Sequence, residues 1–328
     1  MTCSRWSLKL LERQGCQSFI GNQLQSMKTK YLYLRSLYMI STFVRRIQEV
    51  YPNLHIQDVK QNEIGQNNNV FILNESLVFR FPKYKEGLEK LKRETEMLET
   101  ICKTVTMQIP YPAYKSFNEM EVGKAFMGYK LIEGAPFWKE ELLTIKSQDL
   151  LDTIASQLVT FLIELHSMEI PKAVVIQKQH ESVHRIIENL FIRIREKLFP
   201  FMRVDAQKKV VDNFYTFLNN THNHNLEKTY IHGDFGAGNI IWNRKENRIE
   251  GVIDFGGSGL GDPAYDFAGI LSSYGKEFFE ICTNLYPGGK QISERVHFYR
   301  STFALQEALH GIDHNDQEAF KNGIKEFR

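Results

Sequence analysis

Residues 230–266, which read YIHGDFGAGNIIWNRKENRIEGVIDFGGSGLGDPAYD, decide the fold of this chain. Two short apolar runs within them, residues 239–242 and 251–253, are typical of strands, and the polar residues 244–248 between the runs predict a hairpin. Such a hairpin would bring Asn239 and Asp254 to the same end. Asp234 stands just before the first run, so we expect three oxygen-bearing side chains to gather in one place.

The order and spacing of these side chains indicate phosphoryl transfer from a nucleotide bound with Mg²⁺. Asn239 lies five residues after Asp234 and His232 lies two before it, as in the catalytic loop of protein kinases. Residues 254–256 repeat the metal-binding Asp-Phe-Gly triplet. We therefore predict Asp234 as the catalytic carboxylate that faces the acceptor hydroxyl, and Asn239 and Asp254 as ligands of Mg²⁺.

Other polar residues of the same stretch favour a structural role. A single Asp beside a Gly is most often a loop cap or a surface charge, but the full ordered set argues against that reading. Asp262, directly before a proline, and Asp266 predict a turn and a helix N-cap that lock the loop, and we group His232 with them. Glycines at 233, 236 and 238 allow the loop to fold tightly.

On these motifs the chain resembles the aminoglycoside phosphotransferase family, and within it the 2''-phosphotransferase branch. Three further segments carry the resemblance: residues 79–83 (FRFPK), 162–166 (LIELH) and 303–311 (FALQEALHG). It covers the chain from residue 39 to the end. The resemblance implies an α+β, two-lobed, protein-kinase-like fold, with a small β-rich nucleotide-binding N-lobe over residues 39–133 and a larger, mainly helical C-lobe over residues 134–328.

Composition and charge agree with an enzyme that acts on a small cation. The chain has 328 residues, 42% of them apolar and 24% charged, enough for two modest cores. Residues 39–328 hold 35 basic and 38 acidic residues, a net charge of −3, which suits a cationic small molecule better than a nucleic acid. Four cysteines without metal-ligand spacing indicate a reduced, cytoplasmic setting without disulfides.

The first 38 residues differ from the rest, because they hold six basic residues and one acidic residue. We predict a basic, poorly ordered extension, or sequence upstream of the true start, with a basic surface-binding arm as the alternative. Arg35 interrupts the apolar stretch of residues 31–44, which argues against a signal peptide or a membrane partner. We expect a monomer.

The N-lobe should begin with a helix over residues 39–50 and strands over residues 54–59, 70–73 and 77–81. The loop between the first two strands holds a single glycine, Gly65, and should cover the phosphates. Arg80 occupies the place of the kinase lysine, with Lys83 as second choice for phosphate binding. Glu94, in a helix predicted over residues 88–102, is the expected ion-pair partner of Arg80. In the alternative interpretation, Glu94 lies on a solvated face of that helix.

The strand predicted over residues 126–132 should lead the chain from one lobe to the other. Tyr129 and Ile132 would line the pocket of the nucleotide base. In the branch that the chain resembles, a bulky aromatic residue here accompanies a preference for GTP, so GTP is the first choice of donor and ATP the second. A tyrosine of the core is the alternative reading.

The C-lobe should hold the acceptor between helices predicted over residues 148–168, 182–198 and 205–220. A cationic acceptor requires carboxylates near Asp234. The candidates are Glu277, Glu280 and Glu307, with Asp313, Asp316 and Glu318 further along. Residues 272–274 (Ser-Ser-Tyr) stand where some members of the family carry acids.

The sequence therefore predicts transfer of a γ-phosphate to an aminoglycoside hydroxyl, the 2''-hydroxyl by resemblance, which would give antibiotic resistance. Two alternatives stay open. One is a kinase of a small metabolite such as choline, homoserine or a glycated amine, and the other is a nucleotide-binding pseudoenzyme that acts as an interaction module. A protein kinase is disfavoured, because the segment from Phe255 to Asp262 is too short for an activation loop.

Overall fold

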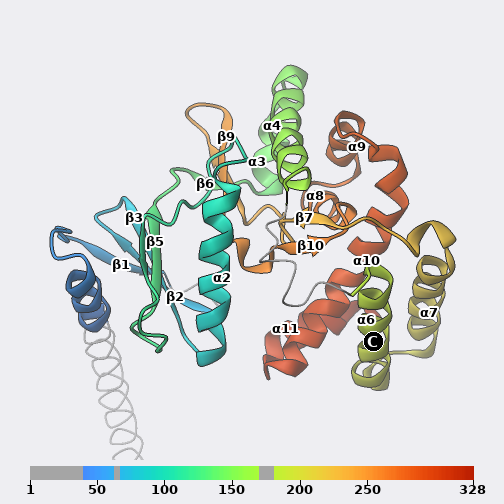
Figure 1. Cartoon of the computed structure of the whole chain (residues 1–328). Helices are drawn as coiled ribbons and strands as arrows, with labels where there is room; N and C mark the ends of the chain where they lie inside the picture. The colour runs from blue at the N-terminus through green and yellow to red at the C-terminus, as the bar shows by residue number, and fades with distance from the viewer. Residues whose placement is uncertain (1–39, 63–66, 170–180) are drawn as a thin grey trace, which may run out of the picture. The chain divides into compact units, whose positions relative to one another are not determined.

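The computed structural model describes residues 40–62, 67–169 and 181–328, and these form two compact units (Figure 1). Unit 1 holds the described residues up to Lys92 together with Ala113–Leu131, and unit 2 holds Arg93–Pro112 and Ile132–Arg328. Helix α2 (Lys85–Ile101) is thus divided between the units. The predicted extension of residues 1–38 and Gly65 lie outside the described residues.

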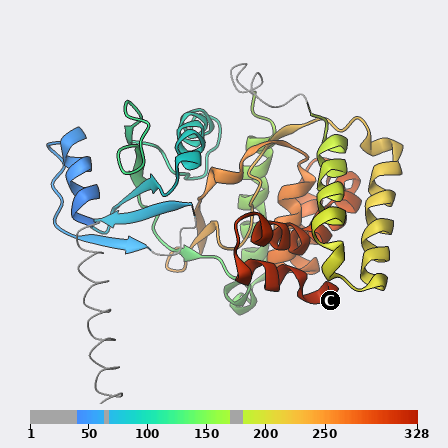
Figure 2. The ribbon, with the colours of Figure 1, turned by 90° about the horizontal axis from the view of Figure 1, so that it is seen from below.

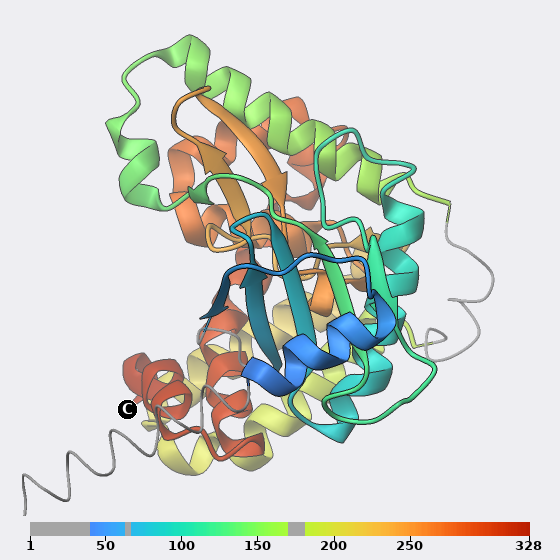
Figure 3. The same cartoon turned by 90° about the vertical axis from the view of Figure 1, so that its left-hand side faces the viewer.

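Unit 1 is built on an antiparallel sheet of five strands in the order β1-β2-β3-β5-β4. A helix over residues 40–50 packs against one face of this sheet (Figure 3), where Phe43 and Ile47 join the core. Aromatic side chains dominate that core, and the rings of Phe43 and Phe81 lie 4.6 Å apart. The strands are β1 (Val59–Asn62), β2 (Asn68–Leu73), β3 (Leu77–Pro82), β4 (Tyr114–Ser116) and β5 (Phe126–Lys130).

The first predicted strand is wrong in position, because residues 54–58 are not paired in the sheet and β1 begins at Val59. The side chain of Asn74 takes the place of a strand partner. Its Oδ1 accepts from the amides of Gln57 at 2.8 Å and Asp58 at 3.2 Å, and its Nδ2 donates to the carbonyl of His55 at 2.7 Å. The apolar side chains of the segment still pack on the core, which explains the misleading pattern.

The central strand β3 presents one set of side chains to the core and the other set to the opposite face of the sheet. Phe79 and Phe81 point into the core cluster, so the alternation of side chains along a strand places Arg80 on the opposite face. Gly128, opposite Phe79 on β5, is required here, since a Cβ at this position would lie 2.8 Å from the phenylalanine ring.

Unit 2 is mainly helical and carries two small sheets. A three-stranded sheet has the order β6-β8-β9, and β7 pairs with β10. Helices α6 and α7 pack against each other, and α10 contacts both (Figure 2). The strands are β6 (Ala135–Pro136), β7 (Thr229–Ile231), β8 (Ile240–Asn243), β9 (Arg248–Val252) and β10 (Gly259–Gly261). The helices are α3 (Lys139–Thr144), α4 (Gln148–His166), α6 (Val183–Lys197), α7 (Val204–Asn219), α8 (Ala264–Tyr274), α9 (Lys276–Leu285), α10 (Gly289–Asp313) and α11 (Gln317–Ile324).

The predicted hairpin is confirmed, since β8 and β9 pair antiparallel with Ile240 opposite Val252. The long helices of the C-terminal part also match their predicted ranges within a few residues, because each carries an apolar stripe at helical spacing. Within the described residues, none of the helices combines the length and apolar character that crossing a bilayer requires. Cys102 and Cys282 are free thiols.

Candidate active site

The site is built on residues 232–239, here called the catalytic loop, which follows strand β7 (Figure 1). The side chain of Asp266 in α8 holds the start of this loop. Its Oδ2 accepts from the amide of His232 and its Oδ1 from the amide of Gly233, both at 2.8 Å, and His166 Nε2 lies 3.1 Å from Oδ2. Asp266 is fully buried, and these contacts satisfy its carboxylate.

His232 ties the loop to the hairpin and is fully buried. Its Nε2 lies 3.1 Å from the carbonyl oxygen of Ile253, which can only accept, and its Nδ1 accepts from the amide of Asp234 at 3.2 Å. One ring nitrogen therefore donates and the other accepts, which requires the neutral form with the proton on Nε2. His232 therefore connects the catalytic loop to the end of the hairpin.

The side chains of Asp234 and Asn239, near the two ends of the catalytic loop, are in direct contact. The Nδ2 of Asn239 donates to Asp234 Oδ2 at 2.8 Å and to the backbone carbonyl of Asp234 at 2.9 Å. Asp234 itself is exposed. Within the described residues, the donor to its carboxylate is this amide alone, so Oδ1 can receive a proton from a bound hydroxyl.

Asp254 follows β9 at the same end of the hairpin as Asn239. The amide of Ile253 donates to the carbonyl of Asn239 at 2.8 Å, which fixes the two segments side by side. Asp254 is exposed and has a left-handed backbone with φ of 62°, a conformation unusual for a residue with a Cβ and common at functional sites. A Cβ on Gly256 would lie 3.3 Å from Asp254 Oδ1 and 3.7 Å from Glu94 Oε2, so the carboxylate of Glu94 also borders this turn.

Gly233 is required by the approach of the Asp-Phe-Gly turn to the catalytic loop. Its φ is +77°, and a Cβ here would lie 2.2 Å from the carbonyl oxygen of Gly257. Both the dihedral angle and the contact exclude a side chain. The rings of Phe235 and Phe161 stack beneath the loop at 5.6 Å, so the loop also has an apolar base.

Helix α8 holds the middle of the loop through a residue to which the sequence reading gave no role. Ser273 Oγ accepts from the amide of Ala237 at 2.9 Å. Gly269 on the same helix admits the loop, because a Cβ there would lie 2.2 Å from the carbonyl of Phe235. Residues 272–274 lack the acids that some members of the family carry here, and Ser273 holds the loop instead.

Tyr265 is a second residue that the sequence reading missed. Burial raises the pKa of its hydroxyl, and the negative charges of Asp234 and Asp266 raise it further. Its hydroxyl donates to Gln306 Oε1 at 3.3 Å, and this hydrogen bond lowers the pKa of Tyr265, although the net shift is upward. No motif marks this residue.

Asp262 anchors the far end of the stretch that bears the motifs. Arg295 donates to both of its carboxylate oxygens, at 2.6 and 3.0 Å, and Tyr299 donates to Oδ2 at 3.2 Å. Asp262 also accepts from the amide of Ala264 at the start of α8, whereas Asp266 lies inside this helix rather than at its N-cap. Burial lowers the pKa of Arg295, but the hydrogen bonds to Asp262 and its negative charge raise that pKa by more, so the pKa of Arg295 lies above its ordinary value.

The residues predicted to bind the nucleotide lie in both units. In unit 1, Arg80 and Tyr129 are buried, and the register places them on the same face of the sheet, since Val78 pairs with Tyr129 and lies two residues from Arg80. The amide of Lys83 donates to the carbonyl of Asn67 at 3.0 Å. In unit 2, Glu94 is buried, and Ile132 packs on Gly251 of β9.

The carboxylates predicted to bind the acceptor divide into two groups. Glu277, Glu280 and Glu307 are exposed on α9 and α10, and Glu280 pairs with Lys276 at 3.6 Å. Asp313 is bound by Arg193 and Lys197 of α6, and the hydrogen bond from Lys197 is the main cause that lowers its pKa. Asp316 caps α11, and Glu318 lies in the first turn of that helix.

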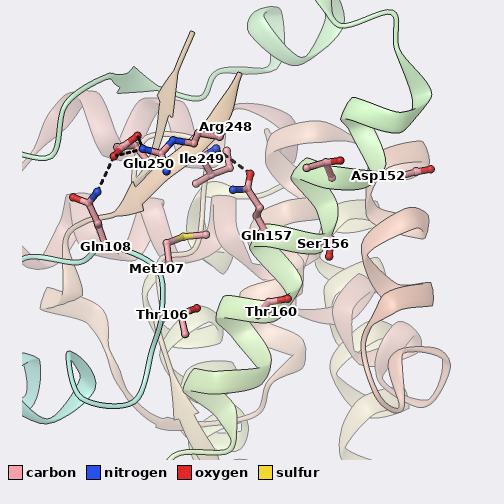
Figure 4. A pocket seen from close by; sticks show the side chains of 11 residues that line it. Thr106, Met107, Gln108, Asp152, Ser156, Gln157, Thr160, Arg248, Ile249 and Glu250 are labelled. Atoms are coloured by element: carbon pink, nitrogen blue, oxygen red, sulfur yellow. Dashed lines mark hydrogen bonds and ion pairs between the residues drawn. The ribbon is translucent and has the colours of Figure 1, made fainter. Parts of the chain in front are cut away.

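A separate groove of about 690 Å³ lies along strand β9 and helix α4 (Figure 4). Glu250 is its most buried acid, and its carboxylate accepts from Gln108 at 2.7 Å and from Arg248 at 3.0 Å. Gln157 accepts from the amide of Ile249 at 3.1 Å and so covers the strand edge. The residues that line this groove include none of the predicted site residues.

The side chains at the end of the hairpin fit a magnesium ion. Mg²⁺ prefers oxygen ligands and is usually held by one or two carboxylates together with substrate phosphates. Asn239 uses its Nδ2 to bind Asp234, which leaves its amide oxygen to face a cation, and Asp254 adds a carboxylate. Within the described residues, no group of three or more His, Cys, Asp or Glu side chains is placed to hold a metal ion.

Comparisons with known proteins agree with this geometry. Viomycin phosphotransferase from Streptomyces vinaceus is 26% identical over 270 residues, which cover 80% of this chain and 91% of that protein. The structure of APH(2'')-IIIa in complex with GDP and kanamycin superposes with a TM-score of 0.78 at 22% identity, over 87% of this chain and 96% of that one. The ADP-bound structure of the aminoglycoside phosphotransferase APH(2'')-Ib gives 0.69 at 24% identity, over 86% and 96%.

These structures confirm the predicted protein-kinase-like α+β fold, with a small antiparallel sheet in one unit and a mainly helical second unit. The model of the phosphotransferase enzyme family matches residues 58–299, which include the catalytic loop, the hairpin and Asp254. The match extends over well more than half of the chain. The chain therefore belongs to the phosphotransferase enzyme family, APH.

Proposed function

We propose that this protein transfers the γ-phosphoryl group of a nucleoside triphosphate to a hydroxyl of an aminoglycoside antibiotic. We further propose the 2''-branch of the family, the 2''-hydroxyl as the acceptor group, and GTP before ATP as donor. The catalytic loop supports the reaction type. Support for the acceptor comes from the relatives, whose names include viomycin phosphotransferase and a kanamycin complex of APH(2'')-IIIa.

In the proposed reaction, Asp234 orients the acceptor hydroxyl and accepts its proton as the oxygen attacks the γ-phosphorus. The bond from that phosphorus to the β–γ bridging oxygen breaks, and the nucleoside diphosphate leaves with the electron pair. Asn239 and Asp254 would hold Mg²⁺, which when bound neutralises phosphate charge. Asn239 also fixes Asp234 through its amide, so the carboxylate is aimed before the substrate arrives.

The donor site is proposed from residues in both units. Arg80 and Lys83 would bind phosphate oxygens, with Glu94 orienting Arg80, and Gly65 would lie in the loop that covers them. Tyr129, which shares a face of the sheet with Arg80, and Ile132 would contact the base. GTP is proposed first because a bulky aromatic residue at this place accompanies a preference for GTP in the branch that the chain resembles. The acceptor would meet Asp234 together with Glu277, Glu280 and Glu307, in a monomer located in the cytoplasm.

The observation that carries the proposal is the pair formed by Asp234 and Asn239, joined at 2.8 Å on a loop whose start is fixed by a buried carboxylate. A pseudoenzyme would have no need to hold an exposed carboxylate in this way. The same geometry would serve a kinase of choline or homoserine, so the acceptor must be decided by experiment.

The test is an assay of nucleoside diphosphate release with GTP and ATP against kanamycin, gentamicin, viomycin, choline and homoserine, with the product mapped by NMR. Phosphorylation of kanamycin at the 2''-hydroxyl with a lower KM for GTP is the expected result. Turnover of choline or homoserine alone would show that the acceptor is a small metabolite and not an aminoglycoside. Absence of turnover with every acceptor, together with tight nucleotide binding, would favour the pseudoenzyme.

A further inference from the structure

Trp138 is an exposed aromatic residue that borders the catalytic loop. It follows strand β6 at the N-cap of α3, and 54% of its surface is exposed, whereas Trp242 nearby is 4% exposed. The Cη2 atom of its ring lies 3.5 Å from the position of a Cβ on Gly238. The indole thus rests against the loop between Asp234 and Asn239.

The backbone around Trp138 is fixed on both sides, although its ring is open to solvent. The amide of the preceding Phe137 donates to the carbonyl of Ile240 at 2.8 Å, and the carbonyl of Phe137 accepts from the hydroxyl of Tyr274 at 2.8 Å. The ring of Phe137 packs on Trp242 at 4.9 Å and on Tyr274 at 5.5 Å. A ligand that stacks on Trp138 would therefore meet a surface whose backbone is already ordered.

Exposed aromatic residues on their own need no explanation, and Tyr111 is one such residue at 61% exposure. Trp138 differs in two respects. It touches a glycine of the catalytic loop, and its anchor Tyr274 belongs to α8, the helix whose Ser273 and Asp266 hold that loop. The open face of the indole therefore lies beside the elements that present Asp234 to the acceptor.

We propose that Trp138 forms an aromatic wall of the acceptor site, against which an amino-sugar or aminocyclitol ring bearing ammonium groups stacks. The inference rests on the proposed function. The face of an indole is electron-rich and attracts ammonium groups, while the apolar face of a sugar ring packs on it, and the phosphates of the donor gain neither contact. Trp138 would add an attraction for cyclic cationic acceptors to the charges predicted on α9 and α10.

The test compares Trp138→Leu, which removes the aromatic face, with Trp138→Phe, which keeps one. Tyr111→Leu removes an equally exposed aromatic residue elsewhere and serves as the matched control. We expect Trp138→Leu to raise the KM for kanamycin about tenfold, with the KM for GTP unchanged and kcat within about threefold. Trp138→Phe should stay within about threefold of the wild type, and Tyr111→Leu should change nothing.

Intrinsic fluorescence provides a readout that does not require turnover. In a Trp6→Phe background, kanamycin without nucleotide should change the emission, and the additional change Trp138→Phe should abolish the response. If no acceptor is phosphorylated, the proposed function fails, and the fluorescence titration still decides whether Trp138 binds a cationic ring. A rise in the KM for GTP alone, or an unchanged KM for kanamycin in Trp138→Leu, would overturn the inference.

Discussion

The catalytic loop and the groove along β9 both carry acidic side chains, but these side chains differ in burial and in hydrogen bonding. In the groove, the carboxylate of Glu250 is buried and takes hydrogen bonds from Gln108, Arg248 and Asn243. At the loop, Asp234 and Asp254 are exposed, whereas the buried Asp266 beneath them is satisfied by two amides and a histidine.

This difference separates carboxylates that hold the fold from those that can perform chemistry. A buried and saturated carboxylate stabilises the structure, and its removal leaves donors without partners. An exposed carboxylate can take a proton or a cation at little cost to the fold. The groove holds a carboxylate of each kind, the buried Glu250 and the exposed Asp152, and the predictions below test this distinction.

The largest effect should follow from Asp234→Asn, which keeps the size of the side chain and removes the carboxylate. We expect kcat to fall about 10³-fold, because no carboxylate remains to accept the proton of the substrate hydroxyl. The melting temperature and the affinity for GTP should stay near those of the wild type. Kinetics together with calorimetric titration of GTP measures both quantities.

The matched control for that variant is Asp152→Asn, which removes an exposed carboxylate of the groove on α4. Its kcat should stay within about twofold of the wild type, since a surface carboxylate away from the reacting atoms adds little. Full activity of Asp234→Asn, or an equal loss in both variants, would contradict the distinction between the two regions.

Asp266→Ala should come next, and its effect should fall on the fold before the chemistry. The change leaves the amides of His232 and Gly233 buried without an acceptor, so the free energy of unfolding should drop by about 3 kcal/mol. Urea denaturation followed by circular dichroism measures this value. Asp266→Asn, which keeps one acceptor oxygen, should lose less, and equal losses would show that the hydrogen bonds to the loop are not the cause.

The sequence predicted the hairpin, with Asn239 and Asp254 at the same end of it, because these features depend on local patterns. Two apolar runs around a polar turn leave few other arrangements, and the interval of five residues between Asp234 and Asn239 fits one tight loop. Ser273 and Tyr265 could not be found in the same way. Ser273 binds a loop more than 25 residues earlier, and the charge of Asp234 raises the pKa of Tyr265 across a similar separation in the sequence, so no local pattern records either interaction.

The error at residues 54–58 has a related cause. Their apolar side chains alternate as in a strand, but the side chain of Asn74, far along the chain, satisfies the backbone there instead of a neighbouring strand. Burial alone gives the same pattern for a strand and for an extended segment packed on a core. Asp313 is similar, because its two cationic partners on α6 lie more than 110 residues away.

Glu250→Gln tests whether the buried carboxylate of the groove contributes to stability but not to catalysis. The amide keeps the shape of the side chain and loses its charge toward Arg248, so we expect the free energy of unfolding to fall by about 1 to 2 kcal/mol. Because the groove contains none of the predicted site residues, kcat and both KM values should stay unchanged at a temperature where the variant is folded. A loss of kcat in the folded variant would show that the groove is coupled to the reaction.

The smallest effect should come from Ser273→Ala, which tests whether α8 positions the catalytic loop as well as supporting it. Removal of the hydroxyl leaves the amide of Ala237 without its acceptor, and that residue lies between Asp234 and Asn239. One neutral hydrogen bond contributes about 1 kcal/mol, so a looser loop should lower kcat about threefold to tenfold with little change in either KM. Ser273→Thr keeps the hydroxyl and should restore most of the rate, whereas Ser272→Ala, the exposed neighbour, should have no effect. If Ser273→Ala lowered stability without lowering kcat, the serine would belong with Glu250 among the residues that hold the fold, and the position of Asp234 would depend on Asp266, His232 and Asn239 instead.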